Sequence, residues 1–389
     1  MRFSIPRKTL AMFSGVAVLL VATAAVADAP LKIGLIWTYS TNDPTTQAFD
    51  AGIQTYMKMH GDSVAGRQVE IIKRDDGGIN PDLAKRHAQE LIVSENVDAI
   101  GGFVWTANAT AAGTVALAAK KPEFVANATA LGYLDKFPNM SRYAFTIYEL
   151  GQVMGRYAAA HGIKRVFSIY FNIQSGIDAA KGFEETFTAA GGKVLGTDAV
   201  PMGSKEFTPY LQRVKDAKPD AIWLWMPATS GAPQFLQTFH TLGLDRDGVK
   251  ILATGDLVEE NNLKAEGDAA IGVISTYTYS QWHNSALNRE FVKQFKLIAP
   301  NIEPNFTAVE AYDMMQGIYA VAQAQKGGFD YDKAMETIKT LKWESPRGPV
   351  AMDPLTRDLI QNVYVRRTEK VNGKLQNTEF ETAPMIKNP

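Results

Sequence analysis

Short apolar runs alternate with amphipathic stretches along the first part of the chain, which is typical of parallel β-strands separated by helices. The stretch that starts at Asn80 illustrates the helices, because Asn80 can cap a helix and Pro81 suits its first position. The strands expected in this part are Leu31–Trp37, Gln68–Lys73, Asp98–Phe103, Glu123–Ala126 and Tyr143–Ile147.

The pattern then starts again, and the two copies are similar in sequence. "AGRQVEI" at 65–71 matches "AGGKVLG" at 190–196, and "VDAIGGF" at 97–103 matches "PDAIWLW" at 219–225. Two βαβαβ halves follow, each a parallel sheet with helices on both faces, so the predicted fold class is α/β with two doubly wound lobes. The strands expected in the second copy are Arg165–Tyr170, Lys193–Val200, Ala221–Met226, Ile251–Ala253 and Ala270–Thr278.

After the second copy the order changes. Helical patterns at 283–298, 307–325 and 330–341 are followed by expected strands at 348–352 and 359–366. Such a tail can return to the first lobe and then cross to the second. Because no Gly/Ser-rich or Pro-rich linker is visible, we expect the repeated passage between lobes to form a hinge.

Residues 1–27 have the features of a secretory signal peptide. Three basic residues precede an apolar run at 10–25, and the small residues "AVA" at 25–27 supply a cleavage site. A membrane anchor is the alternative, but no other segment is apolar enough to span a bilayer. We therefore expect export to a bacterial periplasm.

The composition excludes several classes of function. The 389 residues include 40 Lys and Arg against 41 Asp and Glu, and the signal peptide holds three of the basic residues, so the mature chain is slightly acidic and no nucleic-acid partner is expected. With no cysteine, disulfides, thiolate metal sites and cysteine nucleophiles are excluded. We expect no cofactor and no bound metal.

Ligands of open parallel sheets bind beyond the carboxyl ends of the strands, so the segments that follow the expected strands are the candidate site. These segments are rich in Ser, Thr, Asn and aromatic residues, and none contains Lys or Arg. A neutral ligand or a singly charged anion is therefore expected. Hydroxyl groups and helix N-termini can bind one carboxylate, a role that suits Thr106, Asn108 and Thr129. The same residues could equally serve only as helix caps.

Aromatic residues at these strand ends suggest a ring-lined site. Tyr39, Trp105 and Tyr148 lie past the ends of their strands and are candidate ligand contacts. Trp223 is better explained as sheet core, and Trp225 faces the same way by strand alternation. In the loop at 38–47 Tyr39 offers a ring and Ser40 a hydrogen bond; the alternative is a solvent-exposed loop.

Enzyme motifs do not emerge. The chain lacks GxSxG, HExxH, GxxxxGK[ST] and GxGxxG, so no catalytic residue is expected. A periplasmic hydrolase is the alternative, and only Ser280 with His283, or Asp256 with a strand-end hydroxyl, could supply its chemistry.

Taken in order, "LKIGLIWTYS", "VAGRQVEIIKRDDGGINPDLAKRHAQELI", "PEFVANATA" and "PDAIWLW" resemble the type I periplasmic solute-binding proteins of ABC importers, the family that contains the leucine/isoleucine/valine-binding proteins. The resemblance implies a three-crossover hinge, a permease in the inner membrane as partner, and a monomer. It implies lobe I at 28–147 plus 279–353 and lobe II at 148–278 plus 354–389. A sensory ligand-binding protein stays an alternative.

The resemblance also implies a set of ligand contacts. Lobe I would supply Trp105, Thr106 and Asn108 near a ligand carboxylate, with Asn127 and Thr129 beside them. Lobe II would supply Tyr148, Ser175, Met226 or Pro227, and Asp256, which stands where amino-acid binders place an acid against the ligand ammonium. Phe145 and Ser175 depart from the family pattern, and the first loop is unusually aromatic. We therefore expect an aromatic acid first and a branched-chain or other amino acid second.

Overall fold

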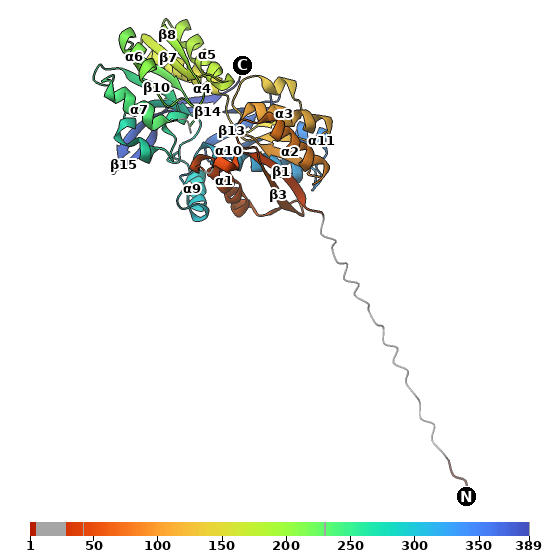
Figure 1. The fold of residues 1–389 in the computed structure, drawn as a ribbon. Helices are drawn as coiled ribbons and strands as arrows, with labels where there is room; N and C mark the ends of the chain where they lie inside the picture. Colours follow the sequence, from red (N-terminus) through yellow and green to blue (C-terminus); the bar gives the residue numbers. More distant parts are fainter. Residues whose placement is uncertain (5–28, 42, 229–230, 389) are drawn as a thin grey trace.

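The computed structural model describes residues 1–4, 29–41, 43–228 and 231–388. Apart from residues 1–4, the expected signal peptide lies outside the described residues. Figure 1 shows two α/β lobes side by side, with the first part of the chain in one and the middle part in the other. The predicted fold class, two mainly parallel α/β lobes, is confirmed.

The sheet of lobe I has the strand order β2-β3-β1-β4-β5-β6 and is parallel except for β2. Alternation along β1 sends Leu35 to one face, where α1 and α10 pack, and Ile36 to the other, where α2 and α3 pack. The elements are β1 (Leu31–Trp37), α1 (Pro44–His60), β2 (Ser63–Val64), β3 (Arg67–Asp75), α2 (Pro81–Val93), β4 (Ala99–Gly102), α3 (Thr106–Ala118), β5 (Glu123–Val125), β6 (Met140–Arg142) and α10 (Phe306–Ala324).

The sheet of lobe II has the order β12-β13-β14-β11-β10-β9-β7-β8, with β15 paired to β14. Its strands β8, β7, β9, β10 and β11 are parallel and the C-terminal strands antiparallel. The strands are β7 (Arg165–Phe171), β8 (Lys193–Val200), β9 (Ala221–Trp225), β10 (Lys250–Thr254), β11 (Ile274–Tyr277), β12 (Lys342–Ser345), β13 (Gly348–Met352), β14 (Leu359–Val371) and β15 (Lys374–Ile386). The helices of this lobe are α4 (Ile147–Ala160), α5 (Gln174–Ala189), α6 (Thr208–Ala217), α7 (Ala232–Thr241) and α8 (Leu263–Glu266). The later helices α9 (Ala286–Ile298) and α11 (Tyr331–Ile338) pack in the core of lobe I.

Two local expectations were wrong. The strand expected at 143–147 is the first crossover between the lobes, because the sheet of lobe I ends with β6 and α4 begins at Ile147. The second sheet is extended by β15, which the sequence analysis did not predict. Its segment is largely polar, since it pairs on the sheet edge and most of its side chains are exposed or half-buried.

The crossovers are held by buried ion pairs. Arg142 Nε lies 2.6 Å from Asp358 Oδ1, and Arg347 Nη2 lies 2.6 Å from Asp313 Oδ2 and donates to Tyr143 O at 2.8 Å. All four charged side chains are buried, and these bonds fasten the first crossover to Asp358 and Arg347.

The lobe boundaries stay a proposal. Strands β12 and β13, which we expected in lobe I, are hydrogen-bonded into the sheet of lobe II, although Val350 and Met352 pack in the core of lobe I. The third crossover, residues 353–358, begins directly after β13.

Helices α1 and α10 pack so closely that one position on α1 must be glycine. A Cβ on Gly52 would lie 2.2 Å from Ala308 O. Gly52→Ala should therefore force the helices apart and lower the free energy of unfolding by about 1–3 kcal/mol. Urea unfolding would measure this loss, with Gln54→Ala on the exposed face of α1 as the control. Equal stability of the two variants would contradict the close packing.

Candidate functional site

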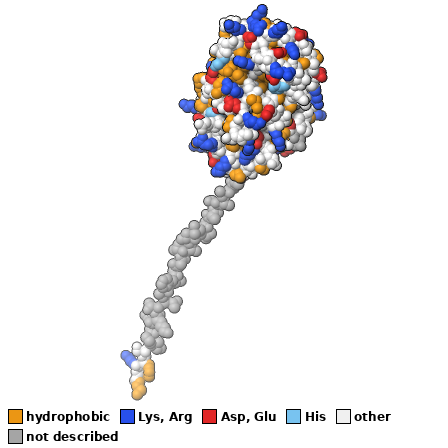
Figure 2. Space-filling view, turned by 90° about the vertical axis from the view of Figure 1, so that its left-hand side faces the viewer, with side chains coloured by type: hydrophobic (Ala, Val, Ile, Leu, Met, Phe, Trp, Pro, Cys, Tyr) orange, Lys and Arg blue, Asp and Glu red, His pale blue; other side chains and the backbone are white. Residues whose placement is uncertain are grey.

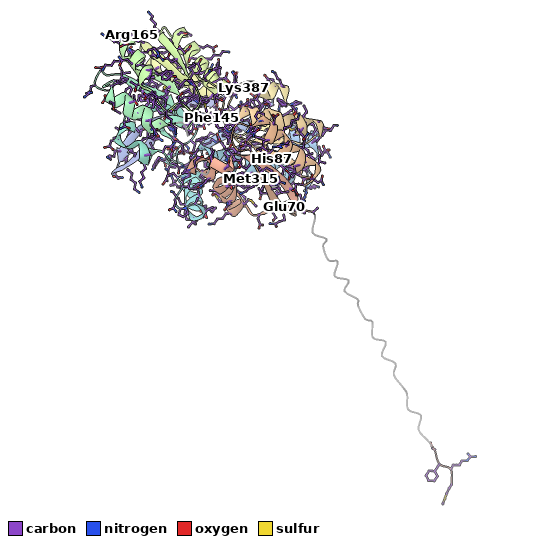
Figure 3. The ribbon with its side chains drawn as sticks, viewed as in Figure 1. Glu70, His87, Phe145, Arg165, Met315 and Lys387 are labelled. Atoms are coloured by element: carbon purple, nitrogen blue, oxygen red, sulfur yellow. The ribbon has the colours of Figure 1, made fainter. Side chains whose placement is uncertain are left out.

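A cavity of about 260 Å³ lies between the lobes, at the carboxyl ends of both sheets. Lobe I contributes the segments after β1, β4 and β5, and lobe II contributes those after β7, β9 and β10. Phe145, in the first crossover, also lines it, and Figure 3 shows Phe145 between the lobes while Arg165 and Glu70 lie at opposite ends of the molecule. The cavity occupies the place where open parallel sheets bind ligands.

Six of the eleven expected ligand contacts line this cavity. Both lobes supply them, and in one place they meet, because Thr129 Oγ1 lies 3.4 Å from Ser175 Oγ across the lobe boundary. The six are Trp105, Thr106, Asn127, Thr129, Ser175 and Asp256. Ligand binding by these side chains stays a prediction.

The other five do not line the cavity, and two of them belong to the first loop. The backbone N–H groups of Tyr39 and Ser40 donate to Asp75 Oδ1 at 3.0 and 3.2 Å, which fastens this loop to the end of β3. Thr38 and Thr41 face the cavity instead. The expectation that this loop borders the cavity therefore agrees with the geometry, but with different side chains.

Asn108, Tyr148 and Met226 contribute to the fold instead of the cavity wall. The Asn108 side-chain amide is fully buried and donates to Asp76 Oδ2 at 2.8 Å, which ties α3 to the loop after β3. The Tyr148 hydroxyl donates to Glu185 on α5, and Met226 is fully buried in the core of lobe II. Each side chain already has partners within its own lobe.

Two helices begin at the cavity without a side-chain cap. Helix α3 of lobe I follows Trp105, helix α5 of lobe II follows Ile173, and neither preceding residue accepts a capping hydrogen bond. Thr106 and Ala107 at the start of α3, and Gln174 and Ser175 at the start of α5, line the cavity. Because first-turn N–H groups lack partners inside their own helix, these two N-termini favour a negatively charged group.

Indole rings form much of the remaining wall. The Nε1 atoms of Trp105 and Trp225 are buried and have no hydrogen-bond partner, whereas Trp37 Nε1 donates to Thr46 O at 3.1 Å. Trp225, for which strand alternation favoured a place in the sheet core, also lines the cavity. It is the last residue of β9, so it reaches the cavity, while Trp223 on the same face stacks on Phe183 with ring centroids 4.7 Å apart.

Asp256 is a buried carboxyl group in the cavity wall. Its Oδ2 accepts from Thr254 Oγ1 at 2.7 Å, and its Oδ1 accepts from the Tyr277 hydroxyl at 3.2 Å. Burial raises the pKa of Asp256 from 3.8 to about 6, while these two hydroxyls and the charge of Arg366 oppose the rise. The carboxyl group is therefore mainly ionised at neutral pH, and its hydrogen bonds to Thr254 and Tyr277 fix its orientation.

The described lining includes no Lys, Arg or His side chain. Elsewhere basic and acidic side chains are interspersed over the surface, as Figure 2 shows for one face. The expectation of a site without cations therefore agrees with the geometry. A bound carboxylate would have to rely on hydroxyl groups, side-chain amides and helix N-termini.

Two lobes that enclose a small aromatic cavity at the carboxyl ends of their sheets define a solute-binding protein. A family model described as periplasmic binding protein matches residues 30–374, and the chain belongs to this family. The resemblance of the sequence to the type I periplasmic solute-binding proteins is therefore confirmed. In the described part of the chain, no helix combines the length and apolar character needed to cross a membrane.

The proteins similar to this chain include the following three. The Leu/Ile/Val-binding protein homolog 6 of Brucella suis is 36% identical over 376 residues, covering 96% of this chain and 95% of the relative. An ABC transporter solute-binding protein from Rhodopseudomonas palustris BisB5, in complex with 3,4-dihydroxybenzoic acid, is 40% identical with a TM-score of 0.87, covering 93% of this chain and 99% of that one. One from strain HaA2, in complex with p-hydroxybenzoic acid, is 36% identical with a TM-score of 0.90, covering 93% and 98%.

The carboxyl group of Asp256 should make stability depend on pH. Its pKa in the folded protein, about 6, exceeds the ordinary 3.8, so the folded form holds a proton that the unfolded chain releases, and stability falls as the pH rises through this range. Asp256→Asn removes this effect, which amounts to roughly 3 kcal/mol at full ionisation. Urea unfolding at pH 4 and pH 7 measures this. The free energy of unfolding of Asp256→Asn, relative to that of the wild type, should be higher at pH 7 than at pH 4.

Asp216→Asn, on the exposed face of α6, controls for the change in net charge. A stability difference between Asp256→Asn and wild type that is the same at both pH values would contradict the raised pKa.

Proposed function

We propose that the protein binds a small aromatic carboxylate in the periplasm and delivers it to an ABC importer. The observation that carries this proposal is the cavity itself, which combines indole and phenyl walls, two helix N-termini and no cation among its described residues. Affinity would come from burial of the ring, at about 25 cal/mol per Å² of apolar surface, and orientation from the polar groups.

In this proposal the ligand carboxylate faces the starts of α3 and α5. Thr106 and Thr129 of lobe I and Ser175 of lobe II then donate hydroxyl groups, and the first-turn N–H groups supply further donors. Since one helix belongs to each lobe, the anion would draw the lobes together.

Asp256 favours a ligand with a ring hydroxyl. A ligand carboxylate and an ionised Asp256 share one small cavity, and the repulsion between them is offset best when the ligand places a hydrogen-bond donor on Asp256. A phenol hydroxyl can donate this hydrogen bond from the end of a flat ring that lies opposite the carboxylate. The complexes of the two Rhodopseudomonas palustris relatives with hydroxylated benzoic acids support this choice. A branched-chain amino acid, with its ammonium on Asp256, is the second candidate.

The family supports the remaining parts of the proposal. Its members in the comparison are binding proteins of ABC transporters, which favours a permease partner, export by the expected signal peptide and no enzymatic activity. The Ser280–His283 pair of the hydrolase alternative lacks support, because Ser280 Oγ donates to Asn377 O, His283 Nδ1 pairs with Glu379, and neither lines the cavity. The other pair, Asp256 with a strand-end hydroxyl, does meet, since Thr254 Oγ1 donates to Asp256 at 2.7 Å, but Thr254 does not line the cavity. A sensory role would use the same cavity and differ only in the membrane partner.

A calorimetric panel tests the ligand class. 4-Hydroxybenzoate should bind about ten- to a hundredfold more tightly than 4-fluorobenzoate, because a hydrogen bond to a charged group contributes roughly 1.5–3 kcal/mol and fluorine cannot donate one. Leucine should bind more weakly than either acid. Tighter binding of leucine would favour the amino-acid alternative, and binding of neither class would remove the proposal.

Thr129→Val tests the carboxylate position. It keeps the shape of the side chain but removes the hydroxyl, so the affinity for 4-hydroxybenzoate should fall about five- to tenfold. Thr188→Val, on the exposed end of α5, is the matched control and should leave the affinity unchanged. An unchanged affinity for Thr129→Val would place the carboxylate elsewhere in the cavity.

A further inference from the structure

One short segment of lobe II touches both the cavity and lobe I. Residues 256–261 follow β10; Asp256 faces the cavity, and Glu259 and Asn261 contact lobe I. Leu257 and Val258 between them are buried in the core of lobe II, which fixes the segment to that lobe. A ligand on Asp256 therefore acts on the same segment that joins the lobes.

Glu259 is the centre of this contact. Its Oε2 accepts from Thr45 Oγ1 at 3.1 Å, and its Oε1 accepts from Asn305 Nδ2 at 2.8 Å. Thr45 lies in the first turn of α1 and Asn305 caps α10, so the carboxylate of lobe II binds the starts of the two lobe I helices. Asn261 supplies two more donors to Glu259, its backbone N–H and its Nδ2, each at 3.0 Å. Glu259 is fully buried.

Asn261 makes a second, reciprocal contact with lobe I. Its Nδ2 donates to Glu303 O at 3.0 Å, and its Oδ1 accepts from Glu303 N at 2.7 Å. These two hydrogen bonds have the pattern of a residue pair in a β-sheet, and from Glu303 only backbone atoms take part. Together with the bonds from Thr45 and Asn305, four hydrogen bonds cross the lobe boundary from two residues.

One of these partners in lobe I, Thr45, belongs to the cavity wall. Thr45 and Thr307 line the cavity, and Thr307 Oγ1 donates to Thr45 O at 2.6 Å and lies 2.9 Å from Asn305 Oδ1. Movement of Glu259 away from lobe I would therefore break its bond to one wall residue, Thr45. Glu260 next to it is not available as a substitute, because it pairs with Arg366 at 3.1 Å within lobe II.

We propose that Glu259 and Asn261 form a clasp that exists only when the lobes are closed on a ligand. Glu259 is then a positioning residue: it acts through Thr45 and Asn305 and does not touch the ligand. The clasp slows ligand release, because release requires the four bonds across the boundary to break before the lobes part. This inference rests on the proposed function, since the ligand on Asp256 holds the segment in place.

The test compares release with binding. Stopped-flow tryptophan fluorescence with 4-hydroxybenzoate should show that Glu259→Gln and Asn261→Ala each raise the dissociation rate constant about tenfold and leave the association rate constant nearly unchanged. The ligand-free melting temperature should stay close to that of the wild type, so the ligand-induced shift becomes smaller. Glu303→Gln is the matched control, because the clasp uses its backbone alone, and it should match the wild type.

A merely structural contact would give a different result. If the four bonds persist in the open form, both variants would lose equal stability with and without ligand and keep the wild-type affinity, and this outcome overturns the clasp.

A second readout separates this failure from failure of the proposed function. Because the chain contains no cysteine, Lys85→Cys in lobe I and Lys181→Cys in lobe II can carry a fluorophore pair that reports the distance between lobes. Glu259→Gln should lower the closed fraction in this assay, whichever ligand the wild type binds. An unchanged closed fraction overturns the clasp, whereas a wild type that binds no aromatic acid overturns the proposed ligand.

Discussion

The central physical constraint on the proposed function is that a negatively charged ligand would have to be held without a cation. A buried carboxylate normally recruits Arg or Lys, yet the polar donors in the described cavity lining are hydroxyl groups, the side-chain amides of Asn127 and Gln174, and the starts of α3 and α5. Neutral dipoles can stabilise one negative charge when several of them converge and are already oriented.

The fold places these dipoles without special local structure. In a parallel sheet each strand is followed by a helix whose N-terminus faces the same edge, and two such sheets facing each other bring one helix start from each lobe to a common point. The uncapped starts after Trp105 and Ile173 are the local adaptation, because an ordinary Ser or Asp cap would occupy the N–H groups that a ligand needs. The basic side chains that the chain buries lie instead at the crossovers, as Arg142, Arg347 and Arg366 show.

The sequence predicted the two lobes well, because strand and helix periods repeat and the two copies match. It predicted the cavity residues less well. The ends of the expected strands identified the segments that border the cavity. Which side chain of a segment faces the cavity, however, depends on hydrogen bonds to residues elsewhere in the fold. Asp75 turns Tyr39 away from the cavity, and Asp76 captures Asn108, although both acids are distant in sequence from the residues they hold. No local pattern marks such partners. The strand β15 was missed for a related reason, since an edge strand carries little of the apolar alternation on which the prediction relied.

Asp256 links the site to the hinge. Its carboxylate accepts from Tyr277, and the guanidinium of Arg366 lies 4.9 Å from the centre of the Tyr277 ring while it pairs with Glu260. Gly255 permits this packing, because a Cβ there would lie 2.3 Å from Arg366 Nη2. The positive charge that supports Asp256 therefore stands behind an aromatic ring, outside the cavity, on the strand β14 that follows the third crossover. A donor on the ligand would complete the coordination of Asp256 from the open side, so recognition of the ring substituent and the arrangement of the hinge depend on one buried network.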